Sequence, residues 1–114
     1  MRDIETYDDC LLLITKFYDK LMIDEEIGHF FQALDLSHHI TKVADFWAFI
    51  LVDKPGYNNN MMGAHAKLDL RESDFKRWLH LFHETIGEHF QGEKANLAIE
   101  RSKLVAWTMT SKLS

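Results

Sequence analysis

The chain has 114 residues, which is enough for one domain spanning residues 1–114 and too short for two. Hydrophobic residues make up 46% of it and charged residues 27%, a balance typical of a folded globule and not of a disordered segment. The 13 Lys and Arg against 18 Asp and Glu leave a net charge of −5 without any basic run, so we expect no nucleic-acid or membrane partner.

The N-terminal segment favours a cytoplasmic location. Its first nine residues are acidic and lack the basic and then apolar pattern of a secretion signal. The most apolar run, Phe46 to Val52, is far shorter than the ~18 apolar residues that a membrane-spanning helix needs. The single cysteine, Cys10, cannot form an internal disulfide.

The pattern of apolar residues predicts an all-α fold. One proline and five glycines leave few helix breakers, and apolar residues recur with helical period through most of the chain. A first helix is expected over about 7–22, with Ile14 and Tyr18 on its apolar face. Asp24 is the expected N-cap of a short helix that continues to Phe31.

A central helix is expected after Ser37, its predicted N-cap. It should end before Lys54-Pro55-Gly56, and because its second half is apolar almost all round, it should be buried. The segment 56–70 is the longest irregular stretch of the sequence and has room for about one helical turn.

Two more helices complete the prediction. After Ser73, apolar residues recur at i, i+3, i+4, i+7 and i+11, which indicates a strongly amphipathic helix ending near Gly92. A last helix is expected over about 94–111. Its predicted apolar face consists of Ala98, Ile99, Leu104, Val105 and Trp107.

The seven histidines raise the question of a metal site. A single cysteine excludes thiolate zinc sites. His80 and His83 share a helix face, but neither a His-Glu-x-x-His motif nor paired Glu-x-x-His motifs accompany them, so zinc protease and di-iron sites are poorly supported. Glycine-rich phosphate loops and a serine nucleophile elbow are also missing from the sequence, which argues against nucleotide and acyl-transfer chemistry.

Two histidines stand out by position. His39 lies on the same helical stripe as Val43, and His65 lies in the irregular stretch. If the chain folds back after Pro55-Gly56, these histidines could face each other across a slot lined by aromatic residues. A haem iron with one axial histidine needs that geometry. Composition alone favours the alternative, in which each is a surface or hydrogen-bonded structural residue.

Five short motifs occur in order along the chain: Phe17-Tyr18-x-x-Leu21, Phe30-Phe31, His39-x-x-x-Val43-x-x-Phe46-Trp47, Tyr57-x-x-x-Met61-x-x-x-His65-x-x-Leu68 and Phe75-x-x-Trp78-Leu79-x-x-Phe82. Together they resemble the truncated haemoglobins, more narrowly their group III. The shortened first helix, and a loop with a brief helical turn before His65, agree with that family. The glycine pairs of the other groups are missing, which supports group III, and Asn58-Asn59-Asn60 match no familiar motif.

The resemblance implies a truncated globin fold, a 2-on-2 helical sandwich that encloses a haem. It implies that His65 is the proximal iron ligand, bonding iron through Nε2 while a carbonyl or similar acceptor holds Nδ1–H. The alternative is a solvated loop histidine. Because the sequence has no Cys-x-x-Cys-His, the expected cofactor is haem b, with its iron, bound non-covalently.

On the distal side, the resemblance implies that Tyr18, His39 and Trp78 surround the bound ligand, with Val43 as the apolar residue between them. Tyr18 could instead be a core tyrosine with its hydroxyl at the rim. Trp78 could be a core tryptophan, because its helix face must be buried in any case. His39 could point outward as a gate.

The resemblance also implies further contacts with the haem. Phe31 matches an aromatic residue that wedges against the haem, and Phe46 another wall residue, although both would be core in any fold. Lys42 could reach a haem propionate or be simply solvated. Tyr57 and Met61 are the remaining expected cofactor contacts.

A polar distal pocket of this kind predicts slow release of O2 and therefore argues against simple delivery. The first functional hypothesis is a haem protein that binds O2, NO or other diatomic ligands for redox chemistry, such as nitric-oxide dioxygenation or peroxide reduction, with electrons from a reductase. The second is a ligand sensor or store without turnover. The third is a helical interaction module without haem.

Overall fold

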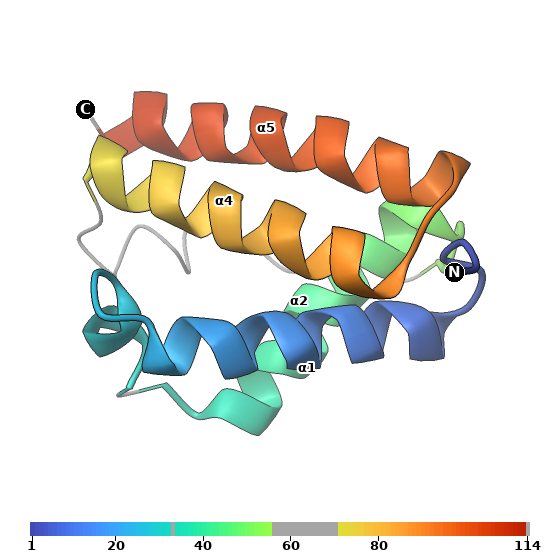
Figure 1. Cartoon of the computed structure of the whole chain (residues 1–114), viewed down its shortest axis with the longest axis horizontal. Coiled ribbons are helices and arrows are strands. Elements are labelled where there is room, and N and C mark those ends of the chain that lie inside the picture. Colours follow the sequence, from blue (N-terminus) through green and yellow to red (C-terminus); the bar gives the residue numbers. More distant parts are fainter. Residues whose placement is uncertain (33, 56–70, 114) are drawn as a thin grey trace.

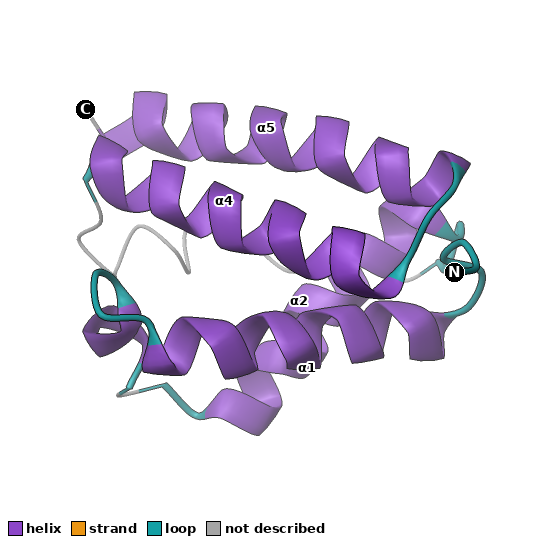
Figure 2. Cartoon of the chain, in the orientation of Figure 1, coloured by secondary structure: helices purple, strands orange, loops and turns teal. Residues whose placement is uncertain are grey.

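The structure is a computed structural model that describes residues 1–32, 34–55 and 71–113, the side chains being described as far as residue 108. Within these ranges every regular element is helical and no strand occurs, so the all-α prediction is confirmed (Figure 2). No helix among them combines the length and the apolar character needed to cross a membrane. The elements are α1 (Tyr7–Ile23), η1 (Gly28–Phe31), α2 (Leu36–Leu51), α4 (Glu72–His89) and α5 (Glu93–Leu113).

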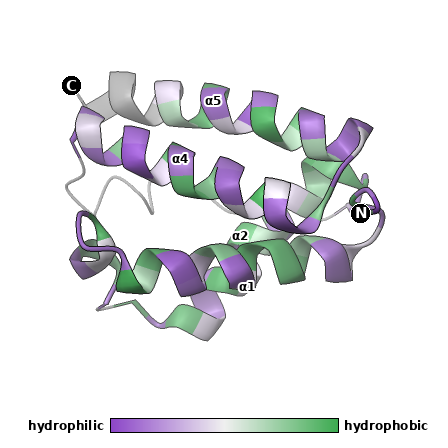
Figure 3. Cartoon of the chain, viewed as in Figure 1, coloured by the Kyte–Doolittle hydropathy of each residue, from purple (hydrophilic) through white to green (hydrophobic). Residues whose placement is uncertain are grey.

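The helices form two packed pairs. Helix α1 packs against α2, and α4 packs against α5, while contacts of α1 with α4 and of α2 with α5 join the pairs (Figure 1). Polar and apolar residues alternate in bands along α4 and α5, as expected for amphipathic helices with one face toward the core (Figure 3). This arrangement confirms the predicted 2-on-2 helical sandwich.

The interior is dominated by aromatic rings from three helices. Phe82 of α4 lies between Trp47 of α2, at 5.0 Å between ring centroids, and Phe17 of α1, at 4.9 Å. The prediction that α2 is buried holds for one face of the helix, where Trp47 is fully buried. On the opposite face, Phe49 is 50% exposed. Apolar composition around a whole helix therefore overstated its burial.

The structure corrects two predicted helix starts. Asp24 is not the N-cap of the short helix, because η1 begins at Gly28 with Ile27 as its N-cap. The Asp24 carboxylate instead accepts the N–H groups of Glu26 and Ile27, both at 3.1 Å, in the turn that precedes η1. Helix α2 begins at Leu36 with Asp35 as N-cap, so Ser37 was wrong as an N-cap and lies inside the first turn of the helix. The amphipathic helix predicted after Ser73 begins at Glu72.

The predicted apolar face of the last helix is also wrong in part. Leu104 and Trp107 are 52% and 66% exposed, whereas Ala98, Ser102 and Ala106 are buried. These small residues recur every four positions and allow α5 to lie close to α4. The Ser102 hydroxyl is satisfied in the interior, donating to the Ile99 carbonyl at 2.7 Å.

The N-terminal segment holds the start of α5. The Asp3 carboxylate accepts the backbone N–H groups of Lys94 at 2.8 Å and Ala95 at 2.9 Å, and so caps a helix more than ninety residues away. Gly92 precedes this helix with φ of 144°, and a Cβ there would lie 2.6 Å from the Asp3 Cγ atom. Only glycine accommodates both the backbone conformation and the close carboxylate.

We expect Asp3→Ala to lower the free energy of unfolding by about 1–2 kcal/mol, because it leaves buried helix N–H groups without their acceptor. Burial raises the pKa of Asp3, but three backbone donors outweigh this and leave the pKa below its usual value. The stabilisation is therefore present above the unfolded pKa and is lost as the pH falls through the folded pKa. Urea denaturation between pH 7 and pH 3 measures it.

The control for this experiment is Asp19→Asn, which changes an exposed carboxylate on α1. The control should match the wild type at every pH. If Asp3→Ala is as stable as the wild type at pH 7, the long-range cap contributes nothing to folding.

Candidate functional site

The interior of the molecule contains a buried polar pair made by α1 and α2. The Tyr18 hydroxyl lies 2.7 Å from His39 Nε2, and the two rings meet edge to face with centroids 5.2 Å apart. Tyr18 is 1% exposed and His39 is half-buried. The pair arises because the buried face of α1 packs on the first turns of α2, which brings together residues 21 positions apart.

Burial keeps the Tyr18 hydroxyl protonated. Loss of solvent raises the pKa of Tyr18 well above its usual value, so its hydroxyl keeps its proton at neutral pH. The hydroxyl donates to His39 Nε2 when the imidazole carries its proton on Nδ1. The site therefore holds a phenol O–H that is ready to donate a hydrogen bond within a largely apolar interior.

Aromatic rings surround Tyr18 on two sides. Phe31 of η1 contacts it at 6.0 Å between centroids, and Phe17 at 5.5 Å, both close to edge-to-face. Trp78 of α4 is 1% exposed and lies 5.5 Å from Phe17, at an interplanar angle of 82°. The structure thus places Tyr18, His39, Phe31 and Trp78 in one connected cluster drawn from four elements.

The residues expected along α2 differ in burial. Val43, one turn after His39, is buried, and Phe46 is half-buried with its ring edge-to-face on Trp47 at 5.3 Å. Lys42 is exposed on the outer side of the helix. Val43 follows His39 by four residues, so the two share a face of the helix.

Three of the expected site residues, Tyr57, Met61 and His65, lie outside the described residues. In the part of the chain that the structure does describe, no group of three or more His, Cys, Asp or Glu side chains could hold a metal ion.

Sequence analysis assigned no role to two residues that link the cluster, Phe17 and Phe82. Phe17 contacts both Tyr18 and Trp78, and Phe82 stacks on Trp78 with centroids 5.5 Å apart. Both residues occur in the sequence motifs, but their ring contacts depend on how α1 meets α4. The one available sign was the position of Phe17 immediately before Tyr18.

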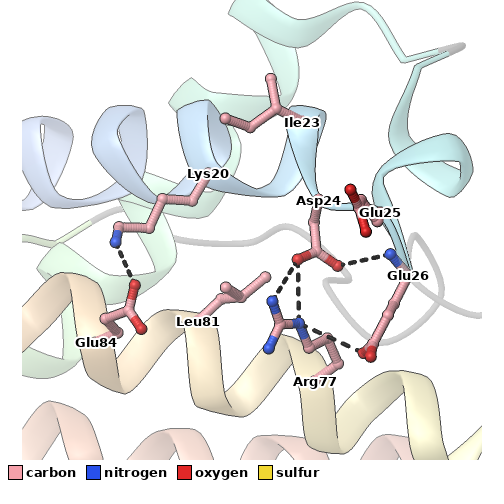
Figure 4. A pocket seen from close by; sticks show the side chains of 8 residues that line it. All are labelled: Lys20, Ile23, Asp24, Glu25, Glu26, Arg77, Leu81 and Glu84. Atoms are coloured by element: carbon pink, nitrogen blue, oxygen red, sulfur yellow. Dashed lines mark hydrogen bonds and ion pairs between the residues drawn. The ribbon is translucent and has the colours of Figure 1, made fainter.

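A hollow lies on the surface between α1 and α4, with a volume of about 310 Å³ (Figure 4). Its two basic groups are engaged by carboxylates: Arg77 bonds Asp24 at 2.7 Å, and Lys20 bonds Glu84 at 2.5 Å. The Arg77 hydrogen bond keeps the pKa of Asp24 below its usual value. These ion pairs tie α4 to the end of α1 and so hold the segment that carries Trp78.

Comparison with known proteins finds relatives over most of the chain. Residues 8–111 match the protein family described as bacterial-like globin. The chain is 29% identical over 101 residues to the group 3 truncated hemoglobin of Campylobacter jejuni, covering 82% of this chain and 80% of that protein. It is 33% identical over 60 residues to a group 1 truncated hemoglobin of Tetrahymena pyriformis, covering 52% of this chain and 50% of that protein.

A solved structure shares the fold over the full length. The crystal structure of the group III truncated hemoglobin from Campylobacter jejuni superposes with a TM-score of 0.87, covering 100% of this chain and 96% of that one at 24% identity. This likeness shows that the two chains have the same arrangement of helices.

Proposed function

The chain belongs to the bacterial-like globin family as a haem-binding truncated haemoglobin, and from this premise we propose that it performs redox chemistry on a diatomic ligand held beside Tyr18, His39 and Trp78. The ligands we consider are O2, NO and CO. The observation that carries the proposal is the buried Tyr18–His39 pair at 2.7 Å, which is a donor site surrounded by aromatic rings.

The residues present fit a haem. A flat apolar cofactor needs aromatic and aliphatic walls, which Phe31, Val43 and Phe46 supply, and its ligand needs a donor in a dry setting, which Tyr18 supplies. We propose that His65 holds the iron of a non-covalent haem b. When bound, the haem would supply an iron atom that binds the diatomic ligand and exchanges electrons with it.

The remaining haem contacts follow the same assignment. We propose that Tyr57 and Met61 pack against the haem, and that Lys42 reaches a propionate. The exposed position of Lys42 supports this role, because a propionate lies at the solvent edge of a haem pocket.

Tyr18 acts as the principal donor. A diatomic ligand that takes electron density from iron becomes a charged acceptor, and a hydrogen bond to such an acceptor contributes about 1.5–3 kcal/mol. That corresponds to a reduction of roughly ten- to a hundredfold in the rate of ligand release. Slow release suits chemistry on the bound ligand and opposes O2 delivery.

His39 regulates the donor. In the structure the Tyr18 hydroxyl is hydrogen-bonded to His39, so a ligand competes with His39 for the same O–H. Because His39 is half-buried, its ring can turn toward solvent and release the hydroxyl. We propose that it acts both as a contact and as a gate.

The reaction that we favour is oxidation of NO by O2 to nitrate, with reduction of peroxide as the second. Conversion of NO and O2 to nitrate consumes one electron per turnover, so the proposal includes an electron-donating reductase as partner. Donors that polarise the ligand act on the charge that develops during either reaction.

The test is consumption of NO by the reduced, O2-loaded protein, with nitrate measured as product and a parallel assay with hydrogen peroxide. We expect at least one substrate to be consumed repeatedly in the presence of a chemical reductant, faster than by free hemin at equal concentration. If the protein binds haem and ligand but exceeds free hemin with neither substrate, a sensor or store replaces this proposal.

A further inference from the structure

We propose that Phe17 is a positioning residue of the ligand site, whose ring sets the orientation of both Tyr18 and Trp78. This inference rests on the proposed function, because it concerns Tyr18 and Trp78, which are placed there beside the ligand and which we take as its two donors. Phe17 itself carries no polar group and does not touch the ligand in this proposal.

The contacts of Phe17 support this role. Its ring meets Tyr18 at 5.5 Å and 69°, and Trp78 at 5.5 Å and 82°, so both contacts are edge-to-face. A third edge-to-face contact, with Phe82 at 4.9 Å and 71°, fixes the Phe17 ring from the α4 side. Phe17 is 1% exposed and closely packed, so any rotation of its ring would displace the neighbouring side chains.

The geometry explains why an aromatic ring is needed. Tyr18 belongs to α1 and Trp78 belongs to α4, so the angle between the two donors depends on what lies between the helices. An edge-to-face contact has a preferred angle, because the positive ring edge points at a negative ring face. An aliphatic side chain fills the volume but imposes no such angle, so each donor would gain rotational freedom.

The other side of Tyr18 is held differently. Phe31 contacts the Tyr18 ring at 6.0 Å and His39 bonds its hydroxyl at 2.7 Å. Phe17 contacts both Tyr18 and Trp78 and so couples Tyr18 to α4. Removing the Phe17 ring should therefore let the Tyr18 and Trp78 rings adopt a wider range of angles relative to each other.

The experiment compares Phe17→Leu and Phe17→Met with the wild type as haem-loaded proteins. The readout is the infrared C–O stretching band of bound carbon monoxide, whose frequency and width report the donors near the ligand. We expect the band to broaden or split, with a component at higher frequency, and the O2 dissociation rate to rise about two- to tenfold. Phe17→Met serves if Phe17→Leu does not yield folded protein.

The matched control is Phe75→Leu, which removes a buried ring one turn before Trp78. Phe75 is 2% exposed and makes no aromatic ring contact with the other described residues. It should lose stability as the Phe17 variants do, yet keep the wild-type carbonyl band. An equal change of the band in Phe75→Leu would show that general loosening explains the result and would overturn the proposal.

Tyr18→Phe separates this inference from the proposed function. If Tyr18→Phe shifts the band while neither Phe17 variant does, Tyr18 is a donor and the positioning role of Phe17 is wrong. If Tyr18→Phe leaves the band unchanged, the donor assignment itself fails, and the role of Phe17 fails with it.

Discussion

Replacement of His65 by alanine is expected to yield a protein that purifies without a Soret band. The proposed axial bond is the one coordinate link between this chain and the haem iron, and the remaining contacts are apolar and non-covalent. The measurement is the absorption spectrum of oxidised and dithionite-reduced protein, followed by titration with hemin. A normal proximal-histidine spectrum in this variant would mean that another residue binds the iron.

Two comparisons separate ligation from folding. His80→Ala removes a histidine that is 62% exposed on α4 and should leave the spectrum unchanged. His65→Gly should recover a histidine-like spectrum when free imidazole is added, because imidazole can occupy the space of the missing side chain. Failure of imidazole to restore the spectrum, together with loss of helical circular dichroism, would indicate a role in folding and not in ligation.

Tyr18→Phe is expected to raise the O2 dissociation rate by about ten- to a hundredfold, because it removes a hydrogen bond to a charged acceptor in a dry site. The change deletes one oxygen atom and keeps the ring, so the contacts with Phe17 and Phe31 remain. Stopped-flow mixing of the oxygenated protein with carbon monoxide measures the rate. A rate that stays at the wild-type value both in Tyr18→Phe and in Tyr18→Phe/His39→Leu would refute the donor role.

A second tyrosine on the same helix provides the control. Tyr7→Phe makes the same chemical change roughly 16 Å away along α1, where the hydroxyl interacts with Asp45. It should leave the O2 dissociation rate at the wild-type value.

His39 could mask the effect of Tyr18→Phe, and a double variant separates the two contributions. Once the hydroxyl is gone, His39 Nε2 is released from its bond and can donate to the ligand in its place. The double variant Tyr18→Phe/His39→Leu should therefore release O2 faster than Tyr18→Phe alone. Equal rates in the two would show that His39 does not substitute as a donor.

Helix boundaries show how far local sequence patterns can be trusted. The first helix, expected over about 7–22, is found at Tyr7–Ile23, and the last, expected over about 94–111, is found at Glu93–Leu113. Two predicted N-caps were wrong: Asp35, two positions before Ser37, caps α2, and Ile27, three positions after Asp24, caps η1. Several residues near the start of a helix can act as its N-cap, and the sequence alone does not show which of them does.

The buried face of α5 was harder to predict from the sequence than the helix boundaries were. Hydrophobicity favoured Leu104 and Trp107 as core residues, yet the structure exposes both and buries Ser102. Which face of a helix is buried depends on how closely its neighbour approaches, and small residues permit the closest approach. A polar residue can then be buried if its hydroxyl finds an acceptor, as Ser102 does.

The helical class, the approximate extent of each helix and the resemblance to truncated haemoglobins could all be derived from residue order, because periodicity and motif spacing are properties of the chain itself. The Tyr18–His39 bond, the contacts of Phe17 with Tyr18 and Trp78, and the buried face of α5 could not. Each depends on the angle and distance at which two helices meet, and these follow from the packing of many side chains together.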